Sequence, residues 1–278
     1  MRSKVIPGLA LIFFAACLFG CESKEFKAER RMWRAHKTAQ AIYKNPKGTP
    51  PYQLAAAQEG YRRIIKDYPD SFFAIQSQFS IGHLYLVMGD FDKARQEYKK
   101  LTLDCDKKGN LCAEADFAIG NSYELQKDWN NALGYYRKIM KSYPLSAKSL
   151  DLPIYIIRHY KKAKDQESVK LFVDEGIAYY HDLKSKSQTE KGDYILQGLI
   201  ARVYMEAGQW QDSIDALNKL IRDYPGQNAG EAYVTKALIY NNKLKDKDKA
   251  KEELREVIKL YPKSKLAAQT EAILKKLN

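Results

Sequence analysis

A short phrase, tyrosine–proline followed by two further residues, returns along the chain and constrains its fold more than any other feature. Its prolines are 75, 81 and 37 residues apart, so the two longer gaps are each about twice the shortest. This spacing predicts units of 37 residues, with two proline boundaries missing near Asp106 and Lys184. The phrase, with serine as the last residue in three of its four copies, occurs at 68–71, 143–146, 224–227 and 261–264.

A second pattern inside each unit predicts how helices pair. In three copies a tyrosine is followed nine residues later by a small residue, and another small residue stands three positions before the tyrosine. A fourth copy has one extra residue between Tyr240 and Ala250, and residues 153–184 form a degenerate copy. Small side chains at these positions allow two helices to approach closely. The three clear copies are Gly82, Tyr85 and Ala94; Gly120, Tyr123 and Ala132; Ala201, Tyr204 and Ser213.

The combined pattern resembles the tetratricopeptide repeat. The resemblance implies antiparallel helix pairs that stack into a solenoid, because one pair cannot bury its own apolar face. We therefore expect an all-α tetratricopeptide-repeat solenoid of about five to six helix pairs over 51–278, with 265–277 as a capping helix. A helix over 25–44 and a loop over 45–51 are expected before it. A second loop is expected at 184–188.

The first twenty residues have the character of a secretory signal peptide. Two basic residues precede an uncharged apolar run that is shorter than the about 20 residues a membrane-spanning helix needs. The run ends in Leu-Phe-Gly-Cys, which resembles the lipobox of bacterial lipoproteins and ends at Cys21. The resemblance implies removal of 1–20, lipidation of Cys21 and a lipid-anchored segment over 21–50. The alternatives are an ordinary signal peptide and a buried N-terminal helix.

Charge is concentrated at the two ends of the mature chain. Residues 21–50 carry 8 basic and 3 acidic side chains, and residues 240–278 carry 11 basic and 6 acidic ones. Residues 51–239 between them are nearly neutral, with 26 basic and 25 acidic side chains. Basic ends predict attraction to anionic lipid headgroups near the anchor or to acidic partner surfaces. Ordinary solvated helix faces are an equal alternative. Nucleic acid is not expected as a partner, because an exported protein does not meet it.

Two cysteines of the mature chain, Cys105 and Cys112, lie on either side of a turn-like stretch at 108–110. In an oxidising compartment such a pair favours a disulfide bond. Two free thiols that pack as small apolar groups are the alternative. A metal site is not expected here, because no histidine lies nearby in the sequence.

The sequence holds no recognisable catalytic arrangement. Its four histidines belong to no two-histidine motif and lie beside no plausible nucleophile, and glycine-rich phosphate loops and paired Cys-x-x-Cys motifs are absent. We therefore expect a non-catalytic protein that uses no cofactor and no metal. Trp33, Trp129 and Trp210 fall at repeat positions, which predicts that they lie in the core.

The first helix of each unit lines the concave surface in repeats of this kind, which predicts a groove for partner proteins. Its mixture of polar and apolar positions is typical of a protein-binding surface. Phe79 and Phe117 are the predicted aromatic anchors, because aromatic residues often dominate binding energy. Burial of both in the core between adjacent units is the alternative. The predicted groove residues are Gln76, Phe79, His83, Leu86, Glu114, Phe117, Asn121, Glu124, Ile195, Arg202 and Met205.

The lipobox, the repeats and the Tyr-Pro-x-Ser phrase together resemble the BamD-type lipoproteins of the outer-membrane β-barrel assembly machinery. The resemblance implies a periplasm-facing scaffold in the outer membrane, whose partners are β-barrel assembly components or unfolded outer-membrane proteins. Glu22 after the cysteine differs from the aspartate that retains many lipoproteins in the inner membrane, which is the alternative location. The alternative function is a repeat scaffold for pilus-secretin assembly or for coordination of peptidoglycan synthesis.

Overall fold

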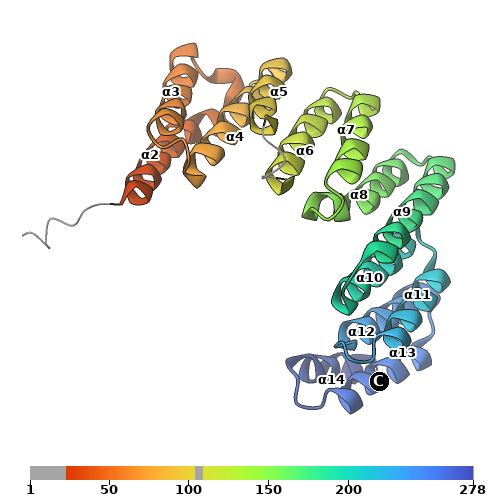
Figure 1. The fold of residues 1–278 in the computed structure, drawn as a ribbon. Coiled ribbons are helices and arrows are strands. Elements are labelled where there is room, and N and C mark those ends of the chain that lie inside the picture. Colours follow the sequence, from red (N-terminus) through yellow and green to blue (C-terminus); the bar gives the residue numbers. More distant parts are fainter. Residues whose placement is uncertain (1–22, 104–108, 278) are drawn as a thin grey trace, which may run out of the picture. The chain divides into compact units, whose positions relative to one another are not determined.

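The computed structural model describes residues 23–103 and 109–277, and every long element in this part of the chain is an α-helix (Figure 1). Six successive helix pairs are followed by a last helix that packs on the one before it, which confirms the predicted all-α class, the pairs and the capping helix. The helices are α2 (Lys24–Lys44), α3 (Pro51–Asp67), α4 (Phe72–Val87), α5 (Phe91–Lys99), α6 (Gly109–Leu125), α7 (Trp129–Ser142), α8 (Ala147–Ala163), α9 (Gln166–Lys186), α10 (Glu190–Ala207), α11 (Trp210–Asp223), α12 (Gly230–Ile239), α13 (Lys247–Leu260) and α14 (Lys265–Leu277).

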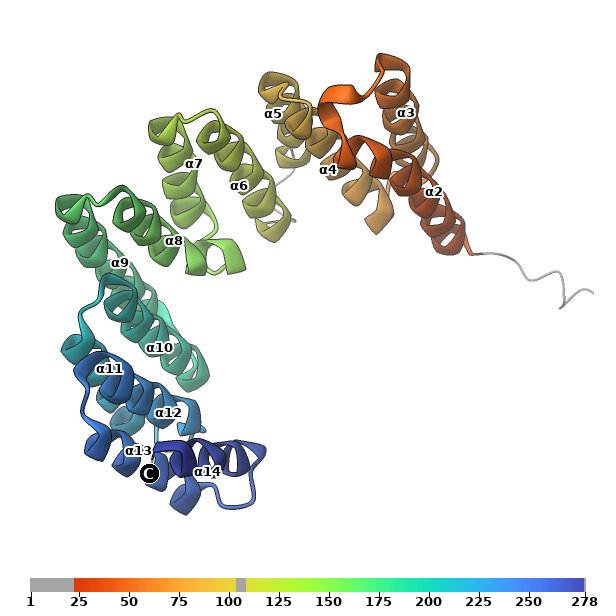
Figure 2. The same cartoon turned by 180° about the vertical axis from the view of Figure 1, so that it is seen from behind.

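The chain divides into two compact units, residues 1–138 and 139–278, with the boundary inside α7. In the first unit, α3 packs against both α2 and α4 (Figure 2). The helix predicted over 25–44 is therefore the first member of the first pair, and it contributes to the same core as its neighbours. That core contains Ala35, Ala39, Ile42, Ala57, Tyr61, Ile64, Ile81 and Leu84.

The Tyr-Pro-x-Ser phrase joins the end of one pair to the start of the next. The tyrosine ends the second helix, and the serine then caps the following first helix with its side chain. At the first joint, the Ser71 Oγ accepts a hydrogen bond from the Ala74 N–H at 3.1 Å and donates one to the Tyr68 carbonyl at 2.8 Å. Ser146 and Ser264 cap α8 and α14 in the same way. The serine therefore satisfies a backbone donor at the helix start that has no partner within the helix.

The small residue of each first helix makes room for an aromatic ring of its second helix. A Cβ atom added at Gly120 would lie 2.7 Å from the Tyr136 ring, and one at Gly82 would overlap the Tyr98 ring. Tyr136 and Tyr98 are both buried. The glycine thus allows a buried tyrosine to pack directly on the helix backbone, which explains why the two residue types occur together in these copies.

The extra residue between Tyr240 and Ala250 is absorbed by a single π-helical turn. This turn covers Tyr240–Leu244 at the end of α12. The Asp246 N–H donates to the Tyr240 carbonyl at 2.9 Å, and the Asp246 side chain then caps α13. Ala250 is fully buried, like the small residues of the other copies. A π-turn is the usual structural form of a one-residue insertion in a helix.

The degenerate copy keeps the helix pair by a different packing. Pro153 lies inside α8, where it lacks an N–H to donate to the preceding turn. The Tyr180 hydroxyl from α9 donates to the Leu150 carbonyl in that turn at 2.6 Å. A Cβ atom at Gly176 would lie 3.0 Å from the Pro153 side chain. A tyrosine of the second helix thus bonds to the carbonyl next to that of Ser149, which Pro153 leaves without its usual N–H donor.

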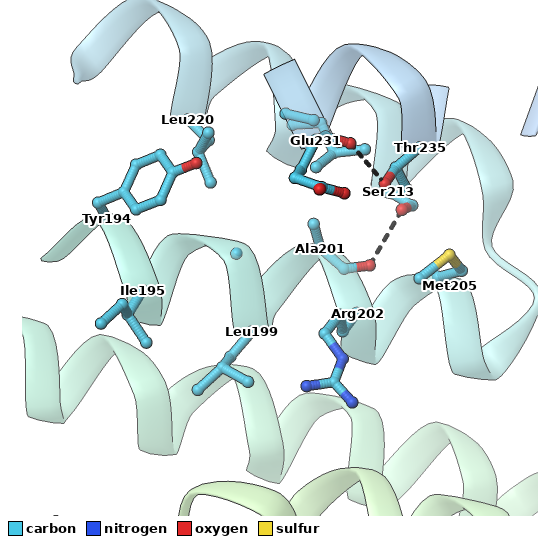
Figure 3. Close-up of a pocket in the computed structure, with 13 residues that line it drawn as sticks. Tyr194, Ile195, Leu199, Ala201, Arg202, Met205, Ser213, Leu220, Glu231 and Thr235 are labelled. Atoms are coloured by element: carbon cyan, nitrogen blue, oxygen red, sulfur yellow. Dashed lines mark hydrogen bonds between the residues drawn. The ribbon is translucent and has the colours of Figure 1, made fainter. Parts of the chain in front are cut away.

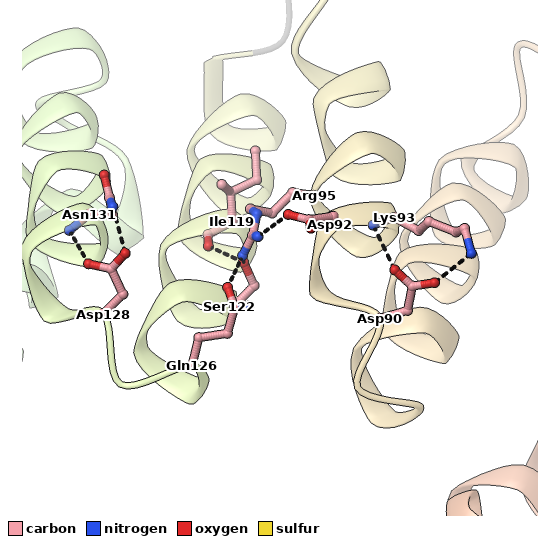
Figure 4. Close-up of polar contacts among 9 residues, drawn as sticks. All are labelled: Asp90, Asp92, Lys93, Arg95, Ile119, Ser122, Gln126, Asp128 and Asn131. Carbon is pink, nitrogen blue, oxygen red and sulfur yellow. Dashed lines mark hydrogen bonds and ion pairs between the residues drawn. The ribbon is translucent and has the colours of Figure 1, made fainter.

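Side chains hold the junction between α5 and α6, where the Tyr-Pro phrase is missing (Figure 4). Arg95 on α5 is almost fully buried, and its guanidinium donates to Ser122 Oγ at 3.2 Å and to Gln126 Oε1 at 2.6 Å. It also pairs with Asp92 and lies 4.1 Å from the centroid of the Tyr123 ring. A planar cation with several donors suits such a junction, since it can bond to several acceptors and stack on a ring at once.

The second missing boundary, between α9 and α10, is shorter than expected. The loop predicted over 184–188 begins later, because α9 continues to Lys186 and α10 begins at Glu190. Thr189 caps α10 by accepting a hydrogen bond from the Gly192 N–H at 3.1 Å.

In the described part of the chain, no helix has both the length and the apolar character that crossing a membrane requires.

The predicted disulfide involves one described residue. Cys112 is fully buried on α6, whereas Cys105 lies outside the described residues. We expect both thiols to resist alkylation in unreduced, denatured protein isolated from the envelope and to react after reduction. Closing so short a loop should stabilise the chain by less than the roughly 3 kcal/mol of a 15-residue loop. Full alkylation of both cysteines before reduction would show that the bond is absent.

Candidate functional site

The predicted groove residues all lie on first helices, namely α4, α6 and α10. Five of them line two surface hollows, one in each compact unit. Ile195, Arg202 and Met205 line a hollow between α10 and α12, and Gln76 and Phe79 line a hollow between α2 and α4.

The α10–α12 hollow has a volume of about 390 Å³ and lies within the second unit (Figure 3). First helices of successive pairs form its two sides, and α11 forms its base. Small residues at facing positions leave this space open, because Gly198 and Ala201 on α10 and Ala232 on α12 have little or no side chain. The lining residues are Tyr194, Ile195, Gly198, Leu199, Ala201, Arg202, Met205, Ser213, Leu217, Leu220, Glu231, Ala232 and Thr235.

Hydrogen bonds fix the walls of this hollow. The Tyr194 hydroxyl donates to the Asn228 carbonyl at 2.8 Å, just before α12 begins, and its ring meets Tyr224 edge-on at 6.1 Å. Burial raises the pKa of the Tyr194 phenol, so the group stays protonated and remains a donor. At the base, the buried Ser213 Oγ donates to the Ala201 carbonyl at 3.0 Å. The hollow is therefore preformed, and an occupant would lose little free energy in shaping it.

The edges of the α10–α12 hollow combine an exposed apolar side chain with both signs of charge. Ile195 is 47% exposed, whereas its neighbours Leu196 and Leu199 on the same helix are buried. Arg202 on α10 and Glu231 on α12 are exposed charged residues in the same lining. An apolar space with a few polar groups at its edge is the usual character of a binding site. This hollow can accept an apolar side chain from a partner segment while its charges orient that segment.

The α2–α4 hollow has a volume of about 490 Å³ and lies within the first unit. Gln76 and Phe79 come from the predicted groove, and Trp33 is an addition to it. The prediction that Trp33 lies in the core is wrong, because its side chain is 62% exposed. On α2 the core positions are taken by alanines and Ile42, so the larger Trp33 remains on the outer side. The lining residues are Glu29, Met32, Trp33, His36, Phe73, Gln76, Phe79 and Ser80.

The two predicted aromatic anchors are both half-buried. The Phe79 ring lies 6.0 Å from the buried Tyr98 while its other side lines the α2–α4 hollow. Phe117 stacks on the buried Tyr136 at 5.5 Å. Both rings thus pack on a repeat tyrosine, so their substitution would alter the core as well as the surface.

The remaining predicted positions interact within their own unit. The Glu124 carboxylate accepts a hydrogen bond from the Tyr136 hydroxyl at 2.9 Å, and Leu86 packs at the edge of the core around Ala94. The His83 ring lies 5.3 Å from Tyr43. His83 is exposed at the surface of α4, but partial burial of its ring disfavours the charged form and lowers its pKa. Glu114 is exposed and Asn121 half-buried on α6.

The predicted groove residues were counted in only the three clearest copies, so the α12 side of the α10–α12 hollow was missed. Glu231 and Thr235 line it, and the fourth copy with Tyr240 already marked this helix as a first helix. Applying the same offsets to that copy would have included Glu231 but not Thr235. Over residues 23–103 and 109–277, no three histidine, cysteine, aspartate or glutamate side chains are grouped so that they could hold a metal ion.

Comparison with known proteins places repeats on the helix pairs described above. One tetratricopeptide-repeat model matches residues 114–146, 199–226 and 231–264, and a second matches 75–103. No curated protein matches the chain in sequence. The matched segments correspond to the pairs α4–α5, α6–α7, α10–α11 and α12–α13.

Several solved structures have a similar arrangement of helices. A tetratricopeptide-repeat protein from Parabacteroides merdae is 15% identical, with 90% of this chain and 98% of that chain covered and a TM-score of 0.38. PilF of Pseudomonas aeruginosa is 13% identical, with 88% and 99% covered and a TM-score of 0.37. YrrB, described as a repeat protein with an unusual peptide-binding site, is 16% identical, with 77% and 99% covered and a TM-score of 0.35. Four segments of the chain thus match tetratricopeptide-repeat models, and they fold into the helix pairs of that repeat, a type of scaffold suited to binding other proteins.

Proposed function

We propose that this chain is a lipid-anchored scaffold of the outer membrane, facing the periplasm, that holds partner proteins during β-barrel assembly. The α10–α12 hollow carries the proposal, since a preformed apolar space with Ile195 exposed at its edge fits a partner segment. The lipobox resemblance at Cys21 supports the anchor, and the Tyr-Pro-x-Ser joints support the likeness to BamD-type lipoproteins. The partners are β-barrel assembly components or unfolded outer-membrane proteins.

Photocrosslinking from Ile195 tests this proposal in intact cells. A photoreactive phenylalanine derivative at Ile195 should crosslink to a β-barrel assembly component or an outer-membrane protein, which mass spectrometry would identify. The same residue placed at Asn218, exposed on α11, serves as the control and should give little product.

Two outcomes would contradict the proposal. Equal crosslinking from Ile195 and Asn218 would show that the α10–α12 hollow does not select partners. Products consisting of pilus-secretin or peptidoglycan-synthesis proteins would assign the scaffold to a different envelope machine. Release of the mature chain from membranes when Cys21 is replaced by serine would support the anchor separately.

A further inference from the structure

A straight stripe of aromatic and basic residues runs along the outer side of α2. Phe26, Arg30, Trp33 and Lys37 are four, three and four residues apart, and with 3.6 residues per turn they fall on one line of the helix. Phe26 is 50% exposed and Trp33 62% exposed. The stripe points away from the protein core, because the opposite side of the helix holds its buried residues. Those residues are Ala28, Ala35, Ala39 and Ile42.

The charge of α2 is strongly positive. Its 21 residues, Lys24–Lys44, include seven lysines and arginines and two glutamates. Within the stripe, the Lys37 Nζ lies 4.9 Å from the centroid of the Trp33 ring, so a cation and an aromatic ring are presented together. Helices that lie on membrane surfaces use tryptophan and phenylalanine to enter the headgroup region and lysine and arginine to meet anionic lipids, and the stripe presents both residue types.

We infer that the stripe of Phe26, Arg30, Trp33 and Lys37 docks on an anionic phospholipid surface and so orients the first unit on the membrane. The inference rests on the proposed anchor in one respect, because acylated Cys21 would hold the start of α2 at that surface only three residues away. Charge complementarity selects lipid as the occupant. Phosphate headgroups offer negative charge along the whole stripe, which matches cations that alternate with rings.

Quenching of Trp33 fluorescence tests the contact in the lipidated mature protein. Trp129 and Trp210 are replaced by phenylalanine so that Trp33 is the only tryptophan. The protein is placed in phosphatidylcholine vesicles with or without phosphatidylglycerol, using acyl chains that carry bromine as a quencher. We expect strong quenching with phosphatidylglycerol and much less without it. Absence of quenching with phosphatidylglycerol, or equal quenching in both, would overturn the inference.

A second measurement does not depend on lipidation. A chain of residues 22–278 lacks Cys21 but still contains every described helix. It is sedimented with phosphatidylglycerol vesicles. Each basic residue near such a surface contributes about fivefold in affinity, so Arg30→Glu with Lys37→Glu should weaken binding by about 25-fold or more. The matched control, Arg62→Glu with Lys66→Glu on the exposed side of α3, should change it little.

The outcomes separate the inference from the proposed function. Unchanged vesicle binding by the α2 double variant would overturn the inference even if Ile195 crosslinks as proposed. The same result, combined with a crosslink to a protein from a photoreactive residue placed at Trp33, would show that the stripe binds protein. Mass spectrometry that finds no acyl group on Cys21 would reject the anchor but leave the sedimentation result to decide the docking surface.

Discussion

Replacement of Tyr136 by alanine is expected to lower the free energy of unfolding of the first unit by about 3–5 kcal/mol. The Tyr136 side chain is fully buried, stacks on Phe117 and meets Trp129 edge-on at 5.9 Å. Its ring also fills the space that Gly120 leaves on the facing helix. Alanine would leave a cavity between Phe117, Trp129 and Gly120. Urea unfolding followed by circular dichroism, with hydrogen exchange of the α6 amides, measures the loss.

Two variants control for this prediction. Tyr136→Phe keeps the ring and removes only the hydrogen bond to Glu124, so it should cost about 1 kcal/mol. Tyr52→Ala removes a ring that is 70% exposed and should change stability by less than about 0.5 kcal/mol. If Tyr136→Ala costs no more than Tyr52→Ala, the ring does not hold the α6–α7 pair together.

Replacement of Glu253 by leucine is expected to destabilise the second unit by about 3–5 kcal/mol. The Glu253 carboxylate lies 2.6 Å from the Lys236 Nζ, and the two side chains are only 15% and 8% exposed. The substitution would leave the Lys236 ammonium buried without its counter-charge. The pair joins α12 to α13, so urea unfolding of the mature chain should detect the loss.

The double variant distinguishes a lost charge pair from lost packing. Lys236→Met combined with Glu253→Leu removes both charges, so it should be much more stable than Glu253→Leu alone. Glu256→Leu breaks an exposed pair with Lys259 and should cost about 0.5 kcal/mol or less. A double variant as unstable as Glu253→Leu would show that packing, and not an unpaired ammonium, causes the loss.

The helix pairs could be predicted from the sequence because their determinants are local and repeat. The nine-residue step from Tyr123 to Ala132 fixes a first helix, a turn and a second helix, and the structure has α6 and α7 at these places. The one-residue insertion after Tyr240 was likewise visible in the spacing. Its form as a π-turn was not, because the pattern counts residues and does not show where a helix widens.

The candidate site could be predicted only in part, because it depends on facing residues of different helices. The offsets placed Ile195 and Arg202 on the correct side of α10. They could not show that Gly198 and Ala232 leave a hollow between two helices. Nor could they show that Trp33 is exposed, since that follows from which residues of α2 its neighbours cover.

The π-turn at Tyr240–Leu244 has a consequence for how such an array tolerates changes in length. One extra residue in a regular helix would rotate everything after it by about 100°, and the following side chains would then point in the wrong direction. The widened turn confines this phase error to a few residues, so Ala250 and Leu254 still face the core. A one-residue insertion near the end of a first helix can therefore be absorbed without disturbing the pair that follows, so repeats can differ in length while they continue to stack.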